Sequence, residues 1–334
     1  MVQYRLVSGP HTHGGESSSR LMYLVMLALT PVTLYGLYLF GVPAALVWLV
    51  SCVTAISVEW VLLRWRGVSE RSAFDGSALL TGWLLALSLP PSAPWWVVVL
   101  GSTFAIAIGK QAYGGLGQNL FNPAMLARVM LLICFPVELT DWRAVSPLRL
   151  AEHGLQASDA WLGVDAITAA TPLAHDTSTQ SMGSLFFGHH AGSFGETSSF
   201  LLLLGGLFFL WRRVINYVIP LAVLLGILVP AAIAYTLAPN SFLPPMVHLF
   251  SGASFMAAFF IATDMVTSPA SAKGQWLFGI GTGLLMFLIR SFGNYPEGAA
   301  FAVLIMNGTT PVIDHFLRPT VFGTRRKLAS RGQA

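Results

Sequence analysis

A threonine near the middle of the chain stands in a pattern that chemistry can use. Thr171 ends the run Asp165-Ala166-Ile167-Thr168-Ala169-Ala170-Thr171 and precedes Pro172. Proline disfavours helix at the residue before it, and small neighbours leave the hydroxyl exposed in a turn. A threonine hydroxyl is a poor nucleophile unless another group activates it. The residues alone therefore favour an ordinary polar turn, with a modification site as the sharper alternative.

A second pattern is the glycine-rich run from Gly114 to Ala124, in which Gly114, Gly115 and Gly117 precede Asn119 and Asn122. Such a run is typical of a tight interhelical turn, and at the start of a helix it can also bind a ligand. It lacks the Lys-Ser/Thr of a nucleotide-binding loop, so nucleotide hydrolysis is not expected. Both asparagine amides offer a donor and an acceptor, but asparagine also caps helices well. A flavin or ligand site and a simple helix cap both stay open.

The residues that usually bind metals are poorly placed for it. Cys52 and Cys134 each lie inside an apolar run. They form no iron–sulfur or zinc spacing and no disulfide framework. His175, His189 and His190 also lack a ligand spacing, and they are expected to be solvated. We therefore expect no metal site in this chain.

The composition points to a membrane protein. Hydrophobic residues make up 55% of the 334-residue chain and charged residues only 10%. Soluble globular proteins carry about 25% charged residues, because their surface needs them. This chain cannot cover a water-facing surface, so membrane lipid is the expected surrounding. The net charge is +4 without a basic stripe, and no nucleic-acid partner is expected.

Uncharged stretches predict the spans. The stretch from Leu21 to Val58 suffices for two helices of about 20 residues each, with Gly41-Val42-Pro43 as the turn. A fifth helix is expected from about Leu120 to Phe135. Counting along the chain predicts an all-α integral membrane protein with about ten transmembrane helices. The expected regions are an N-terminal segment 1–20, a five-helix repeat 21–136, a polar loop 137–197, a second five-helix repeat 198–315 and a basic tail 316–334.

The distribution of lysine and arginine predicts the orientation. With a cytoplasmic N-terminus, fourteen of these residues fall in inner segments and only Arg143 and Arg149 in outer ones. Positive charge resists translocation, so both termini are expected in the cytoplasm. The loop 137–197 then lies outside, in the periplasm of a bacterial inner membrane protein.

A weak internal repeat is also visible. Residues 75–80 resemble residues 251–256, and residues 117–123 echo residues 292–297. The members of each pair are five predicted helices apart. An odd number of helices per half inverts the second half, as in many transporters.

Charges at or near the ends of the predicted spans are expensive to bury. The residues concerned are Glu59, Asp75, Arg128, Asp264, Arg290 and Asp314. Snorkelling to the interface or contact with neighbouring subunits is expected to account for most of them.

Several motifs together resemble a known family. The Thr171 run matches Asp-x-x-Ser/Thr-Gly/Ala-Ala-Thr, on which a flavin transferase attaches FMN. Further matches are Asp75-Gly76-Ser77-Ala78-Leu79-Leu80-Thr81-Gly82, the run 114–124 and Thr263-Asp264-Met265-Val266-Thr267-Ser268-Pro269. Over nearly its whole length the chain resembles the D subunit of the Rnf ion-translocating electron transport complex. This family is related to the B subunit of the sodium-pumping NADH:quinone oxidoreductase, which typically has a longer N-terminal extension. Ala169 stands where the family often has Gly, and Met265 where it often has Pro.

The resemblance implies cofactors and partners. It implies FMN joined through its phosphate to Thr171 within a flavinylation motif that includes Asp165, Thr168 and Ala170, with Asp165 and Thr168 as recognition residues for the transferase. Because the quinone-reductase relative holds a riboflavin in its membrane domain, it also implies a non-covalent riboflavin, which we assign to Gly114, Gly115, Gly117, Asn119 and Asn122. Iron–sulfur and flavin subunits of the complex would supply the ferredoxin and NAD ends, since this chain carries neither set of ligands. The protein would thus act within a Na⁺- or H⁺-translocating oxidoreductase and not catalyse alone.

Two alternatives remain at this stage. One is a solute channel or transporter with inverted repeats, and the other is a component like the B subunit of the quinone reductase. The Thr171 motif discriminates against the first, because a transporter has no need of it.

Overall fold

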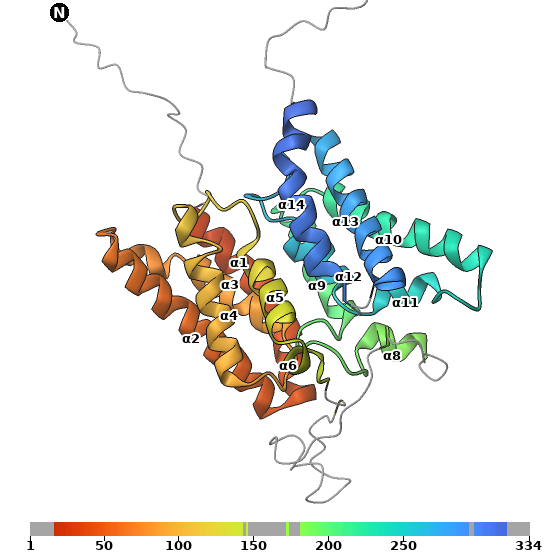
Figure 1. The fold of residues 1–334 in the computed structure, drawn as a ribbon, viewed down its shortest axis with the longest axis horizontal. Coiled ribbons are helices and arrows are strands. Elements are labelled where there is room, and N and C mark those ends of the chain that lie inside the picture. The colour runs from red at the N-terminus through yellow and green to blue at the C-terminus, as the bar shows by residue number, and fades with distance from the viewer. Residues whose placement is uncertain (1–16, 143–144, 146–171, 174–180, 294–296, 319–334) are drawn as a thin grey trace, which may run out of the picture.

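The computed structural model describes residues 17–142, 145, 172–173, 181–293 and 297–318 (Figure 1). All regular structure among these residues is helical, and no strand occurs in the described ranges. The helices form two groups that lie side by side in Figure 1, one coloured red to yellow and the other green to blue. We call the groups the N-terminal half (residues 17–142) and the C-terminal half (residues 181–318).

The N-terminal half consists of α1 (Ser18–Phe40), α2 (Val42–Trp65), the 3-10 turn η1 (Glu70–Phe74), α3 (Ser77–Ser88), α4 (Trp95–Ala107), the 3-10 turn η2 (Gln111–Tyr113), α5 (Pro123–Cys134) and α6 (Pro136–Thr140). The C-terminal half consists of α8 (Met182–Phe187), α9 (Ser199–Trp211), α10 (Val218–Leu237), α11 (Pro245–Phe250), α12 (Ser254–Met256), the π-helical segment η3 (Ala257–Ile261), α13 (Ala272–Phe292) and α14 (Ala299–Phe316).

Five described helices are long and apolar enough to cross a membrane. They are Ser18–Phe40, Val42–Trp65, Trp95–Tyr113, Val218–Leu237 and Ala272–Phe292. Shorter apolar helices occupy Ser77–Ser88, Pro123–Cys134 and Ser199–Trp211. The prediction of an all-helical, multi-pass membrane protein is therefore confirmed. The count of ten spans and the inverted repeat stay predictions.

Turn and cap residues set the helix boundaries. Gly41 separates α1 from α2 with a φ of 69°, a backbone conformation that favours glycine. The predicted turn at Gly41-Val42-Pro43 is thus confirmed. The fifth helix begins at Pro123 and not near Leu120, because the Asn122 side chain accepts hydrogen bonds from the backbone N–H of Ala124 and Met125 and so fixes the start.

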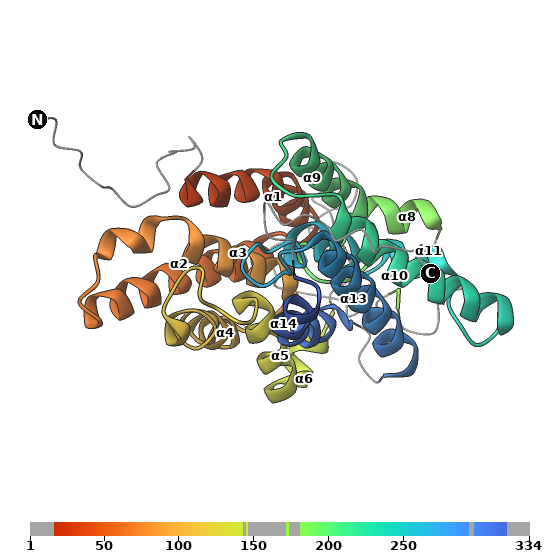
Figure 2. The same ribbon diagram turned by 90° about the horizontal axis from the view of Figure 1, so that it is seen from above.

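The two halves meet along a seam. Helix α1 contacts α9, and α5 contacts α14, as the view from above also shows (Figure 2). Buried apolar side chains form one continuous core through both halves. In α9, Gly205 and Gly206 leave room for the rings of Phe260 and Phe259 from η3, which enter where a side chain on either glycine would sit.

The seam has two ends, which we name by the segments found there. Helix α1 begins and α14 ends at the same end, at the top of Figure 1, and we call this the terminal end. The opposite end carries α8 and the segment 188–198, and we call it the loop end. The backbone N–H groups of Phe194 and Gly195 in that segment donate to the carbonyls of Leu89 and Leu87, at 3.1 and 2.8 Å. This segment of the C-terminal half is thereby bound to the end of α3.

Candidate functional site

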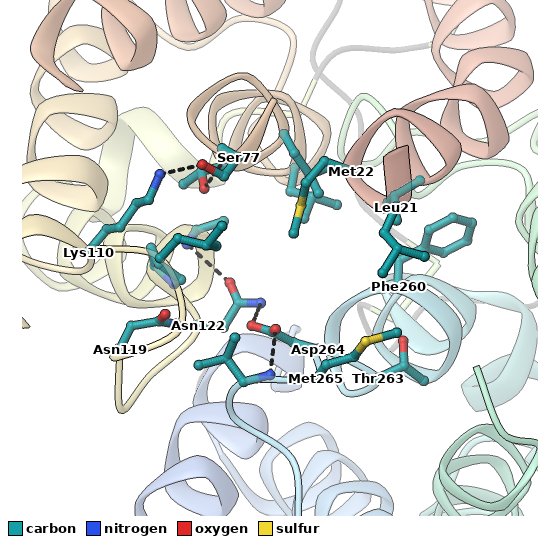
Figure 3. Close-up of a pocket in the computed structure, with 18 of the residues that line it drawn as sticks. Leu21, Met22, Ser77, Lys110, Asn119, Asn122, Phe260, Thr263, Asp264 and Met265 are labelled. Atoms are coloured by element: carbon teal, nitrogen blue, oxygen red, sulfur yellow. Dashed lines mark hydrogen bonds between the residues drawn. The ribbon is translucent and has the colours of Figure 1, made fainter. Parts of the chain in front are cut away.

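A pocket opens at the terminal end of the seam. Its walls come from the start of α1 and α3, the segment 110–124, the end of α9 and the segment that follows η3 (Figure 3). The pocket encloses about 150 Å³, and about 960 Å³ when all empty space up to its open mouth is counted. Most of the lining is apolar, for example Met22, Leu80 and Phe260. A few polar groups face this apolar space, which is the usual composition of a site for a flat organic ligand.

Lys110 lines the pocket but is neutralised within the N-terminal half. Its Nζ donates to both carboxylate oxygens of Glu59, each at 2.7 Å, and to Oγ of Ser77 at 2.6 Å. Ser77 in turn donates to Asp75, and Gln111 donates to Glu59 at 3.0 Å. The three ammonium protons are therefore used, and Lys110 presents no free charge to the pocket.

This arrangement corrects one expectation. Glu59 is 2% exposed and lies in a buried ion pair with Lys110. The expectation that it snorkels or contacts a neighbouring subunit is wrong. The partners are 51 positions apart, so no local spacing in the sequence indicates the pair. A charged residue within a predicted span does signal that some partner must exist.

Asn122 and Asp264 meet across the seam inside the pocket (Figure 3). Oδ1 of Asn122 caps α5, accepting from the backbone N–H groups of Ala124 and Met125 at 3.1 and 3.3 Å. Its Nδ2 lies 3.5 Å from Oδ2 of Asp264, whose Oδ1 accepts from Val266 N–H at 3.1 Å. The capping interpretation of Asn122 is thus confirmed. The same residue also lines the pocket, with an amide donor beside a carboxylate acceptor.

The glycine-rich run shapes the turn before α5. Gly114, Gly115 and Gly117 have φ values of 122°, 110° and 88°, which other residues rarely adopt. None of the three is among the lining residues, whereas Asn119 is, and its Nδ2 donates to the carbonyl of Phe121 at 3.0 Å. The structure thus brings the two asparagines to the pocket and leaves the glycines as the turn that positions them.

The loop end of the seam holds charged groups without a comparable hollow. Arg128 of α5 pairs with Glu297, just before α14, at 2.9 Å. Arg290 of α13 donates to the carbonyl of His248 at 2.7 Å and to Oγ of Ser254 at 2.8 Å. Both arginines are buried. Arg128 is ion-paired and Arg290 is hydrogen-bonded within the chain, which again corrects the expectation of snorkelling.

His190 also departs from expectation. It was expected to be solvated, but it is buried at the loop end, 4% exposed, with Nδ1 3.1 Å from the carbonyl of Ala191. The reason is that the segment 188–198 folds against the end of α3 and does not stay in water. Burial lowers the pKa of His190, although backbone hydrogen bonds and the charge of Glu297 work the other way.

The predicted attachment motif lies outside the described residues, and this holds for Asp165, Thr168, Ala170 and Thr171 alike. The description resumes directly after it with Pro172 and Leu173, both buried. A Cβ placed on Gly252 would come within 3.2 Å of the Leu173 side chain, so this leucine packs against the C-terminal half at the loop end.

Comparisons with known proteins agree over almost the whole chain. The model of the NQR2, RnfD, RnfE family matches residues 5–323. A protein of Stutzerimonas stutzeri, named as the D subunit of an ion-translocating oxidoreductase complex, is 47% identical, with 92% of this chain and 93% of that protein covered. Proteins of the same name are 42% identical in Halorhodospira halophila, with 96% of each chain covered, and 43% identical in Sodalis glossinidius, with 97% of this chain and all of that protein covered.

Proposed function

The chain belongs to the NQR2, RnfD, RnfE family, and from this premise we propose that it carries electrons through bound flavin as a membrane component of an ion-translocating oxidoreductase complex. The relatives named as D subunits match most of both chains, which favours the D type over the B type of the quinone reductase. A solute transporter is disfavoured, because it has no need of the Thr171 motif.

The first cofactor we propose is FMN, joined through its phosphate to the hydroxyl of Thr171. Asp165, Thr168 and Ala170 complete the motif that a flavin transferase would recognise. A phosphate link leaves the ring system chemically intact, so its surroundings still set its potential. The buried Pro172 and Leu173 support this assignment, because they hold the chain beside the motif against the loop end.

The second cofactor is a non-covalent flavin in the seam pocket, and this pocket is the observation that carries the proposal. Its apolar walls suit the faces of a flavin ring, and the Asn122 amide beside the Asp264 carboxylate offers a donor and an acceptor for the polar edge. When bound, such a ring accepts and donates electrons. Residues of both halves would hold it: Asn119 and Asn122 from one, Asp264 and Phe260 from the other.

The charges around the pocket favour riboflavin over a flavin phosphate. Among the described residues that line it, Lys110 is the one cation, and its protons go to Glu59 and Ser77. A phosphate would also approach the carboxylate of Asp264. An uncharged ribityl chain meets neither problem. This argument agrees with the riboflavin that the family resemblance implies.

The remaining parts of the proposal concern the complex. Iron–sulfur and flavin subunits would supply the ferredoxin and NAD ends, and electron flow would be coupled to Na⁺ or H⁺ movement. We further propose an inner membrane location with both termini cytoplasmic and the loop 137–197 periplasmic. Single cysteines at Ser158 and Ser330, in a chain with Cys52 and Cys134 replaced, test this with an impermeant thiol reagent on spheroplasts. Ser158→Cys is expected to react and Ser330→Cys to stay unlabelled.

In-gel fluorescence of the denatured polypeptide tests the covalent site, after co-expression with a flavin transferase. The wild-type band should fluoresce, Thr171→Ala should be dark, and the matched control Thr177→Ala should remain bright. Fluorescence persisting in Thr171→Ala would overturn the attachment site.

Acid extraction tests the pocket, because covalent FMN stays with the polypeptide and riboflavin enters the supernatant. Asn122→Asp keeps the capping oxygen of α5 but removes the amide donor and places a second carboxylate near Asp264. We expect it to lose riboflavin while its covalent band persists. Wild-type protein that releases no riboflavin after gentle solubilisation would overturn the second site.

A further inference from the structure

A second, much smaller cavity lies at the loop end of the seam. It is lined by the segment 190–193, Glu196, Glu297, Gly252 and the pair Pro172 and Leu173. Its volume is about 10 Å³, near the minimum that holds one water molecule. The cavity is therefore too small for an organic ligand, and its chemistry must come from its side chains.

Two carboxyl groups share this cavity. Glu297 is paired with Arg128, and Oγ of Ser193 lies 3.5 Å from each of its carboxylate oxygens. Glu196 is close enough for the charge of Glu297 and that of Arg128 to act on it, and it too interacts with Ser193. Arg290 lies within the influence of both glutamates. Arg128 is thus paired with one of two buried carboxyl groups, and the charge of Arg290 acts on both.

Hydrogen bonding leaves this cluster incomplete. Within the described part of the chain, Oε2 of Glu196, Nε2 of His190 and Nη1 of Arg128 have no hydrogen-bond partner. Glu196 is 3% exposed and His190 is 4% exposed, and both line the cavity. An ionised carboxylate oxygen that is buried without a donor is expensive, whereas a protonated one becomes a donor itself.

We propose that Glu196 and Glu297 form a buried carboxyl pair that binds one exchangeable proton at the loop end of the seam. The proton resides on Glu196, which lines the cavity and has an oxygen without a hydrogen-bond partner, while Glu297 is paired with Arg128. The exchange is Glu196–COOH to Glu196–COO⁻ plus H⁺, and it involves no electron transfer. The proposal is independent of any bound flavin.

The surroundings of the pair favour the protonated form of Glu196. Burial raises the pKa of Glu196 well above its usual range, and the charge of Glu297 raises it further, while Arg128 opposes both. The neighbouring His190 has a lowered pKa, so it remains neutral and can accept a hydrogen bond. A further ionisable group nearby, among the residues that the structure describes, is His248 of α11, whose carbonyl accepts a hydrogen bond from Arg290.

The same groups argue against a metal cation as the ligand. Arg128 and Arg290 would repel it at close range, and the interaction of two unit charges is strong in a buried site. The cavity has room for one water-sized body, and its lining includes the unpartnered imidazole nitrogen of His190. One proton needs only one oxygen.

Infrared difference spectroscopy of the full-length protein in lipid tests this proposal. As pH is raised above the usual titration range of a glutamate, the carbonyl band of a protonated carboxylic acid should persist at first and then disappear. Glu196→Gln should lack this titrating band, whereas the control Glu70→Gln, which alters a partly exposed carboxylate, should keep it. Glu297→Gln should lower the midpoint by at least about one pH unit, because a like charge is removed.

Two further arms make the result decisive. The midpoint of the titration should be the same in NaCl and in choline chloride. A lower midpoint in NaCl would indicate that the pair binds Na⁺, which would overturn the proposal of a proton site. The midpoint should also be the same in Thr171→Ala. Loss of the band in this variant would assign the titrating group to the flavin and overturn the carboxyl pair. If Glu196→Gln does not fold, the wild-type band itself decides: its shift in D₂O supports the carboxyl pair, and absence of a titrating acid band overturns it.

Discussion

The two ends of the seam differ in where their buried charged side chains find partners. At the terminal end, Lys110 and Glu59 neutralise each other inside the N-terminal half. At the loop end, Arg128 and Glu297 do so across the seam. Where the charged side chains of one half pair within that half, the seam can hold an open, apolar pocket. Where charged side chains pair with those of the other half, the two halves must be in close contact.

This difference separates two kinds of ligand. The terminal end encloses about 150 Å³ with few polar groups, by the same measure as the loop end, and this suits an apolar ring. The loop end provides about 10 Å³ among charged groups, which suits water or a proton. Breaking the pairs at each end shows whether charge placement is the cause.

The largest effect is expected from Arg128→Met. It leaves Glu297 buried without its cation and also removes an opposite charge from Glu196. Removing one partner of a buried ion pair costs about 3–5 kcal/mol. Denaturant unfolding in detergent measures it, and Arg128→Met with Glu297→Gln should recover much of the loss. A loss below about 1 kcal/mol would show that the pair does not close the seam.

Lys110→Met should fall at the lower end of the same range, about 3 kcal/mol. Glu59 keeps a hydrogen bond from Gln111, which softens the loss. Because this pair lies within one half, Glu59→Leu with Lys110→Met should be nearly neutral. If the double variant is as unstable as the single one, the pair has a role beyond mutual neutralisation.

A larger side chain in the pocket at the terminal end should weaken flavin binding more than it lowers the stability of the protein. Thr81 lines the pocket, and Thr81→Trp places an indole in the space proposed for the flavin. We expect about a tenfold loss of affinity for riboflavin, or 1.4 kcal/mol, measured by equilibrium dialysis. The control Thr81→Val keeps the volume and should bind normally. Equal binding by both variants would place the flavin elsewhere.

Lowering the pH should destabilise the loop end of the seam, because His190 is buried there in its neutral form. Its pKa is lowered by burial, so the unfolded chain binds more protons below its ordinary pKa of about 6.5. Stability therefore falls as pH decreases from that value towards the lowered pKa. Glu196, with a raised pKa, contributes the opposite slope, so the comparison uses a Glu196→Gln background. There, melting temperature should fall between pH 7 and 5, and His190→Asn should flatten the slope; an unchanged slope would count against a buried neutral imidazole.

The smallest effect belongs to a pair outside the seam. Arg64 and Glu70 lie 3.4 Å apart, and both side chains are well exposed. Exposed pairs contribute about 0–1 kcal/mol, so Arg64→Ala should change the unfolding free energy by less than about 1 kcal/mol. A loss equal to that of Lys110→Met would mean that burial does not explain the ranking.

Local patterns predicted much of the fold. The uncharged stretches, the turn at Gly41 and the cap at Asn122 depend on near neighbours in sequence, and the structure contains all three. Contacts between residues far apart in the sequence cannot be predicted from such patterns. Arg128 and Glu297 are 169 positions apart, and only the packing of α5 against α14 brings them together. The same holds for His190, whose burial depends on contacts with the end of α3.

The π-helical segment η3 makes the terminal pocket tolerant of a change in chain length at one place. A π-helical turn accommodates one residue more than an α-helical turn. Deleting one residue from Ala257–Ile261 would therefore let this segment return to α-helical geometry while Asp264 keeps its place beside Asn122. A deletion from a regular α-helix has no such reserve, because each residue there turns the chain by about 100°. A relative that is one residue shorter in η3 can thus keep the carboxylate in the pocket.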